Sequence, residues 1–114
     1  MGLQVLIECR EYEIHIGKIE DFAELYRNEG LPILLRYMNE PIGFFSAITG
    51  DCSRFIHMWP YRDFEEREKK RGLLQQDPDW ISYISESRSY IKSMNIRFVE
   101  SLDSDAKSLV GRIN

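Results

Sequence analysis

Two positions one strand step apart, His57 and Trp59, carry the clearest chemical potential in this sequence. They lie in the segment Phe55–Tyr61, whose alternation is typical of a β-strand, so both side chains share one face. A histidine on such a face can act as a general base if its pKa lies near the working pH and a carboxylate orients it. Glu8 or Glu11 could supply that carboxylate. The alternative is a half-buried histidine that only hydrogen-bonds a neighbour.

Residues 5–16 alternate in the same way and place Arg10 and Tyr12 on one face with Glu8. An inward-pointing arginine is costly unless it is paired, so Arg10 forms either an internal ion pair with Glu8 or a clamp for a substrate carboxylate. Tyr12 either donates a hydrogen bond to a carbonyl or enolate, or packs as a core aromatic. The candidate catalytic residues are therefore His57, Tyr12 and Arg10.

Three aromatic residues, Trp59, Tyr61 and Trp80, are candidates for the walls of an apolar ligand pocket, although aromatic clusters are core packing by default. Arg67 is a fourth ligand-binding candidate, at the mouth of such a pocket. It belongs to a charged helical run over residues 63–75, which is expected to be a solvated face. Surface pairing with a neighbouring carboxylate is the alternative role for Arg67.

Composition limits the class of protein. With 114 residues, 43% hydrophobic and 30% charged, the chain predicts one globular domain, and its net charge of −4 argues against nucleic-acid binding. Two isolated cysteines predict a reducing, cytoplasmic location. No apolar run is long enough to cross a membrane, and the start of the chain does not resemble a signal peptide. The spacing of histidines, cysteines and glycines predicts no metal site and no cofactor.

The predicted elements alternate as strand, helix, strand, strand, helix, strand. The predicted strands cover residues 5–16, 42–49, 53–59 and 95–100. The predicted helices cover residues 18–38, with a kink or restart near Gly30 and Pro32, residues 63–75, and residues 77–94. This order predicts an α+β, ferredoxin-like βαββαβ fold, a four-stranded antiparallel sheet with helices on one face. The other face needs a cover, and pairing with a second copy supplies it.

Several short patterns together resemble the NIPSNAP-domain family of the dimeric α/β-barrel superfamily. They are Glu8-x-Arg10-x-Tyr12, Gly17-Lys18, Gly43-Phe44-Phe45, His57-x-Trp59-x-Tyr61, Arg67 and Asp77-x-x-Trp80. The resemblance covers roughly residues 5–100 and implies a ferredoxin-like domain, here residues 1–100, and a homodimer that forms a dimeric α/β barrel. The polar composition of residues 101–114 predicts a C-terminal tail. The resemblance implies no particular activity, because the superfamily includes small monooxygenases, haem-degrading proteins, lactone isomerases and stress-induced proteins.

Two functional hypotheses follow, and whether the protein is an enzyme stays open. In the first, a homodimer binds a small, partly apolar molecule, with or without a carboxylate, between sheet and helices. Its enzymatic form is a cofactor-independent isomerase or monooxygenase with His57 as base, Tyr12 and Arg10 stabilising negative charge, and Trp59 and Trp80 as walls. The alternative is a non-catalytic interaction or scaffold domain. Haem binding through His57 is a third, weaker possibility.

Overall fold

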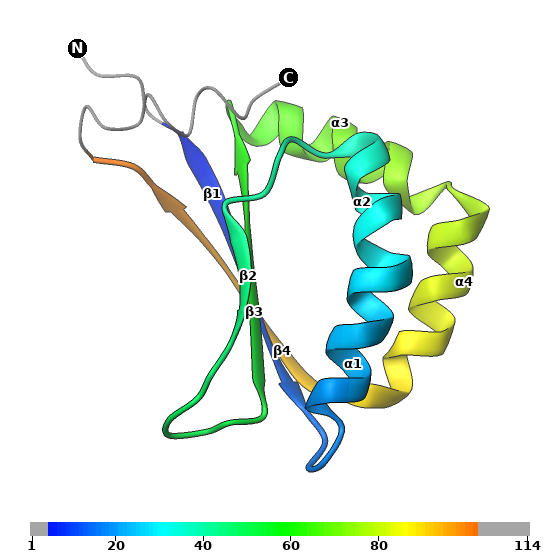
Figure 1. Ribbon diagram of the computed structural model, residues 1–114. Coiled ribbons are helices and arrows are strands. Elements are labelled where there is room, and N and C mark those ends of the chain that lie inside the picture. Colours follow the sequence, from blue (N-terminus) through cyan, green and yellow to red (C-terminus); the bar gives the residue numbers. More distant parts are fainter. Residues whose placement is uncertain (1–4, 103–114) are drawn as a thin grey trace.

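The computed structural model describes residues 5–102, which form a four-stranded antiparallel sheet with its helices packed on one face (Figure 1). The elements in chain order are β1 (Leu6–Ile14), α1 (Ile19–Leu25), η1 (Tyr26–Gly30), α2 (Leu31–Tyr37), β2 (Gly43–Ser46), β3 (Arg54–Tyr61), α3 (Phe64–Gln75), α4 (Pro78–Ser87), η2 (Arg88–Tyr90) and β4 (Ile91–Glu100). The strand order is β2-β3-β1-β4. The predicted ferredoxin-like α+β fold is confirmed.

The central strand β1 places polar residues inside the molecule. Its side chains alternate between buried and half-buried positions, as the sequence pattern predicts. The buried set, which faces the helices, consists of Leu6, Glu8, Arg10, Tyr12 and Ile14. In the antiparallel pairing of β1 with β3, Arg10 lies opposite His57, so both side chains project to the helix-covered face.

A π-type turn, η1, joins α1 and α2 into one continuous helical stretch. The predicted irregularity near Gly30 and Pro32 therefore occurs as this turn rather than as a break, and Pro32 lies in the first turn of α2, where its missing N–H is tolerated. A π-type turn adds a residue and shifts the phase of the side chains. Tyr26 and Gly30, four residues apart, are both buried, and Gly30 lies against the ring of Tyr83 of α4.

The helices α3 and α4 begin at aspartate caps. The Asp63 carboxylate accepts a hydrogen bond from the Glu66 amide, and the Asp77 carboxylate accepts one from the Asp79 amide, both at 2.8 Å. Pro78 follows Asp77 at the first helical position, as predicted. These caps fix where each helix starts and so determine which of its side chains face the sheet.

The prediction that the last helix extends to residue 94 is wrong. The helix α4 ends at Ser87, the short turn η2 follows, and β4 begins at Ile91. Ile91 and Met94 therefore belong to the sheet, where Met94 lies opposite Tyr12. Apolar residues at helical spacing continued across the helix–strand boundary by coincidence, because β4 also needs apolar side chains facing the helices.

The sheet face away from the helices carries no covering element among residues 5–102 (Figure 1). Strand register places Ile7, Cys9, Ile56, Met58 and Val99 on it. The predicted tail over 101–114 lies outside the described residues except for Ser101 and Leu102. Ser101 continues the sheet by one residue, since its N–H donates to the Val5 carbonyl at 3.0 Å.

Candidate functional site

A fully buried carboxylate, that of Glu8, forms the centre of a polar network under the helices. One oxygen accepts hydrogen bonds from Arg10 at 2.7 Å and from Arg67 of α3 at 3.2 Å. The other accepts the Tyr61 hydroxyl at 2.8 Å. The predicted ion pair between Arg10 and Glu8 is confirmed. Arg67 bonds to the buried Glu8 as well as to the exposed Glu68, so its role extends beyond surface pairing.

Glu8 stays ionised in spite of its burial. Burial by itself would raise its pKa, but the charge of Arg10 and hydrogen bonds from Arg67, Tyr61 and Arg10 outweigh burial and lower the pKa to about 2. A carboxylate with this many donors stabilises the fold only while it is charged. Glu8 is therefore a fixed anion that neutralises part of the positive charge around it.

His57 is held as a neutral hydrogen-bond donor. It is 3% exposed, and its Nδ1 accepts the indole N–H of Trp59 at 2.8 Å, with the Tyr26 hydroxyl at 3.4 Å. Because Nδ1 accepts, the proton of the neutral ring lies on Nε2, and within residues 5–102 this buried N–H has no hydrogen-bond partner. Burial, together with the charges of Arg10 and Arg71, lowers the pKa of His57 to about 3.

This geometry argues against the predicted role of His57 as a general base. A base needs a free lone pair and a pKa near the working pH, whereas Nδ1 is occupied by Trp59 and Nε2 carries the proton. The ring is oriented by the indole rather than by Glu8 or Glu11, and Glu11 lies on the opposite face of β1. The same tautomer disfavours haem binding, which requires the Nε2 lone pair.

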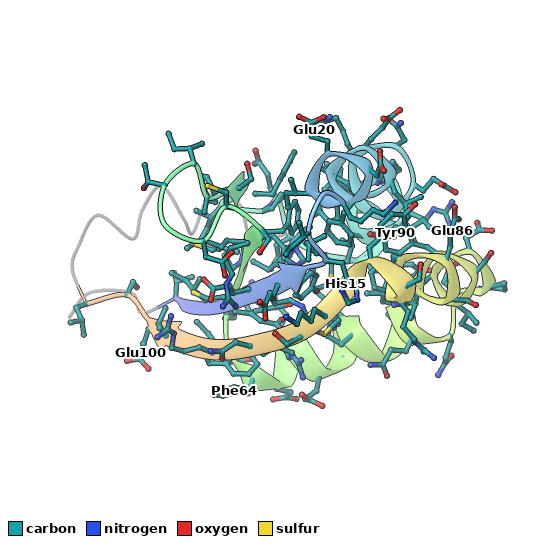
Figure 2. The ribbon with its side chains drawn as sticks, turned by 90° about the horizontal axis from the view of Figure 1, so that it is seen from below. His15, Glu20, Phe64, Glu86, Tyr90 and Glu100 are labelled. Atoms are coloured by element: carbon teal, nitrogen blue, oxygen red, sulfur yellow. The ribbon has the colours of Figure 1, made fainter. Side chains whose placement is uncertain are left out.

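A cavity of about 450 Å³ lies between the sheet and the helices beside this network. It is lined by four of the predicted site residues, Arg10, Tyr12, His57 and Trp80. It reaches the junction of α4 and β4, the end of the sheet near Glu86 and Tyr90 in Figure 2. Its size is within the range of about 300–1,000 Å³ that small-molecule sites usually occupy.

The other three predicted ligand-binding residues do not line this cavity. Trp59 and Tyr61 are 1% and 0% exposed and act as hydrogen-bond donors to His57 and Glu8. Arg67 reaches the same Glu8 carboxylate. The predicted place of Trp59 and Tyr61 on a pocket wall, and of Arg67 at its mouth, is therefore corrected. Trp59 orients the cavity-lining His57, whereas Tyr61 and Arg67 hold the Glu8 carboxylate that pairs with Arg10.

Arg71 of α3 is a charged lining residue that was not predicted from the sequence. It was assigned to the solvated charge run, yet it lines the cavity, and its buried Nε has no hydrogen-bond partner within the described part of the chain. Burial lowers its pKa, and the charge of Arg10 adds to this. Helical spacing carried the signal, because Arg71 lies four residues after Arg67 and three before the buried Leu74.

Aromatic hydroxyls complete the polar lining of the cavity. Tyr12, Tyr26 and Tyr83 all line it. The Tyr12 oxygen accepts the Arg10 Nε–H at 2.8 Å, so its own proton is free to be donated elsewhere. Tyr26 belongs to the apolar stripe of the predicted helix over residues 18–38, where a tyrosine is usually core packing, and Tyr83 was assigned no role.

The fold defines an α+β protein of the ferredoxin-like type, with a cavity between its two layers. The family model for NIPSNAP matches residues 7–104 of the sequence. Because this match covers most of the chain, the chain belongs to the NIPSNAP family.

Individual relatives agree with this assignment. The protein NipSnap homolog of Dictyostelium discoideum is 29% identical over 92 residues, which are 81% of this chain but only 40% of that relative. A solved NIPSNAP family protein from Agrobacterium tumefaciens is 32% identical with a TM-score of 0.83, covering 87% of this chain and 94% of its own. A Nitrosomonas europaea structure, proposed to be an antibiotic biosynthesis monooxygenase, is 12% identical with a TM-score of 0.67 over 90% of this chain and 93% of its own, and so shares the fold alone.

Within residues 5–102, no group of three histidine, cysteine, aspartate or glutamate side chains could bind a metal ion. In the same range, no helix is long and apolar enough to span a bilayer.

Replacing the central carboxylate tests how far the network depends on it. Glu8→Gln is expected to lower the free energy of unfolding at pH 7 by about 3 kcal/mol, because it leaves buried arginines without a counter-ion. The folded-state pKa of about 2 lies below the ordinary value of 4.5, so the contribution of Glu8 is present above that value and is lost as the pH falls toward 2. Urea unfolding between pH 7 and pH 2 measures both effects.

The matched control is Glu24→Gln, on the solvent-exposed side of α1. The Glu24 side chain is exposed and lies outside the Glu8 network, so the change should alter stability by no more than about 0.5 kcal/mol. Equal effects of the two substitutions, or an unchanged acid-dependent loss of stability in Glu8→Gln, would contradict the central role of this carboxylate.

Proposed function

We propose that the protein is a homodimer that binds a small, partly apolar molecule in the cavity between sheet and helices. The observation that carries this proposal is that His57 lines a cavity of about 450 Å³ while its buried Nε2–H has no hydrogen-bond partner among the described residues. A buried donor without an acceptor costs free energy, and a ligand oxygen would supply the missing acceptor. Trp80, Leu34 and Phe22 give the same cavity apolar walls.

Binding is better supported than catalysis. The groups that line the cavity can donate hydrogen bonds to a developing negative charge, as a cofactor-independent isomerase or monooxygenase would require. Tyr12 and Arg10 keep their predicted role in that form of the proposal, and His57 joins them as a donor. A proton-abstracting base is harder to place, because no carboxylate belongs to the lining within the described residues and His57 is protonated on Nε2.

The homodimer is supported by the uncovered sheet face. Phe45 is 49% exposed and Val99 40% exposed, and both lie on this face with Ile56 and Met58 of β3. A contiguous apolar surface of this kind favours an interface, and a two-fold axis brings two identical faces together. The resemblance to dimeric α/β barrels implies the same arrangement.

Ligand binding can be tested with a neutral apolar fluorophore, N-phenyl-1-naphthylamine. We expect saturable binding with one site per chain and at least a tenfold loss of affinity in Ile84→Trp, because the added indole would occupy the cavity that Ile84 lines. Fluorescence titration of the purified protein measures the affinity.

Leu35→Trp is the matched control, since Leu35 is 50% exposed on α2 and does not line the cavity. It should bind the fluorophore as the unmodified protein does. Absence of saturable binding, or equal binding by Ile84→Trp, would refute the cavity proposal and favour the scaffold alternative.

The oligomeric state has its own test. Light scattering at micromolar concentration should give twice the chain mass of 13.5 kDa, and Ile56→Arg should reduce it to one chain by placing a charge on the apolar face. Ile16→Arg, at a 96% exposed position in the turn after β1, should leave the dimer intact. A folded single chain of the unmodified protein at this concentration would contradict the homodimer.

A further inference from the structure

We propose that the ligand of this cavity is an amphipathic monocarboxylate, whose carboxylate is bound by Arg71 and the Nε2–H of His57 and whose apolar body extends toward Ile91 and Met94. This inference rests on the proposed function and adds the chemical class and orientation of the ligand. Four observations support it, namely the charge balance, the unpartnered donors, the shape of the cavity and the position of its polar end.

The charge balance favours an anion. The chain carries a net charge of −4, yet Arg10, Arg71 and Arg88 line the cavity and no carboxylate of residues 5–102 does. Glu8 neutralises Arg10 at 2.7 Å, whereas Arg71 has no ion pair within that range. A largely buried cation without a counter-ion is costly to the fold, and a bound anion removes that cost.

The unpartnered donors match a carboxylate. The His57 side chain is more than nine-tenths buried, and within residues 5–102 neither its Nε2–H nor the buried Nε–H of Arg71 has an acceptor. A guanidinium presents parallel N–H groups that fit the two oxygens of a carboxylate, and the imidazole N–H supplies another donor. Glu8 neutralises Arg10 and Arg88 is exposed to solvent, so Arg71 is the one partly buried arginine of the described lining without an ion pair, which suits a single negative charge better than a double one.

The shape of the cavity accommodates an elongated apolar body. A smaller hollow of about 110 Å³ adjoins it, and all five residues that line the hollow also line the main cavity. Those residues are Ile84, Ile91 and Met94, together with Ser87 and the exposed Arg88 at the rim. The hollow therefore extends the main cavity between α4 and the start of β4 and gives it an apolar end.

The polar and apolar ends are separated along the strands. Arg10 lies opposite His57, whereas Tyr12 lies opposite Met94 and Ile14 opposite Ile91. Ile14 lies four residues after Arg10, which is on the order of 13 Å at about 3.3 Å per residue. This distance suits a medium-length acyl or aryl-alkyl chain whose carboxylate lies near Arg10 of β1 and His57 of β3.

The experiment compares octanoate with octanamide, which has the same chain and no charge. Displacement of N-phenyl-1-naphthylamine gives both affinities at pH 7.5. We expect octanoate to bind at least tenfold more tightly than octanamide in the unmodified protein, and the difference to vanish in Arg71→Met. Octanamide and the fluorophore should bind Arg71→Met unchanged, because the apolar walls remain.

A stability measurement separates a binding role for Arg71 from a structural one. Removing an unpaired buried charge should raise the melting temperature of ligand-free Arg71→Met by a few degrees, and octanoate should no longer raise it further. Arg27→Met, at an exposed position of η1, should change neither the melting temperature nor the selectivity for octanoate. If Arg71→Met fails to fold, Arg71→Lys replaces it and should lose part of the tenfold preference, since an ammonium cannot bind both oxygens in parallel.

Each failure has its own signature. Equal affinities for octanoate and octanamide, or an undiminished preference in the Arg71 variant, would overturn the carboxylate assignment and leave cavity binding intact. Failure of both octanoate and octanamide to displace the bound fluorophore would likewise overturn the carboxylate assignment and leave cavity binding intact. Displacement by octyl phosphate but not by octanoate would overturn the monocarboxylate in favour of another anion. If the fluorophore itself does not bind, the proposed function and this inference fail together.

Discussion

The buried ion pair network around Glu8 is the constraint on which the rest of the structure depends. One carboxylate accepts hydrogen bonds from β1, from the end of β3 and from α3, through Arg10, Tyr61 and Arg67. These contacts hold the charged helix α3 against the sheet. Of the apolar side chains of α3, Leu74 alone is fully buried. Because Arg71 follows Arg67 by about one helical turn, the contact that fixes α3 also brings Arg71 to the cavity.

A second consequence concerns the sign of charge beside the cavity. Glu8 is one anion among several buried or half-buried arginines, so it cannot neutralise all of them. His57 adds no charge, because its ring is neutral, but it adds an N–H that is directed by the indole of Trp59. The lining thus offers hydrogen-bond donors and positive charge, and no carboxylate of residues 5–102 belongs to it. This asymmetry favours an anionic ligand over a neutral one.

Much of the fold could be predicted from the sequence because its signals are local. The alternation in β1, the Asp77-Pro78 cap and the order of elements each follow from backbone geometry and side-chain burial. The pairing of Arg10 with Glu8 was predicted as one of two possibilities for the same reason. The end of α4 was not predicted, since the apolar spacing that continues to Met94 fits a helix and a strand equally well.

The site was harder to predict because its chemistry depends on contacts between distant segments. Arg71 lies in a charge run that resembles a solvent-exposed face, and only the contact of α3 with Glu8 shows which side of the helix is inward. The proton position on His57 depends on the indole two residues along its own strand, which the sequence analysis placed on the same face without pairing them. Residue type alone therefore pointed to a base where the geometry gives a donor.

¹⁵N NMR of the His57 ring as a function of pH tests most directly whether the buried network holds His57 as a neutral hydrogen-bond donor. We expect a neutral ring with its proton on Nε2 and no titration from pH 8 down to pH 5, because burial and neighbouring arginines lower the pKa of His57 to about 3. A His57 ring that carries its proton on Nδ1, or that titrates near pH 6.5, would contradict this expectation.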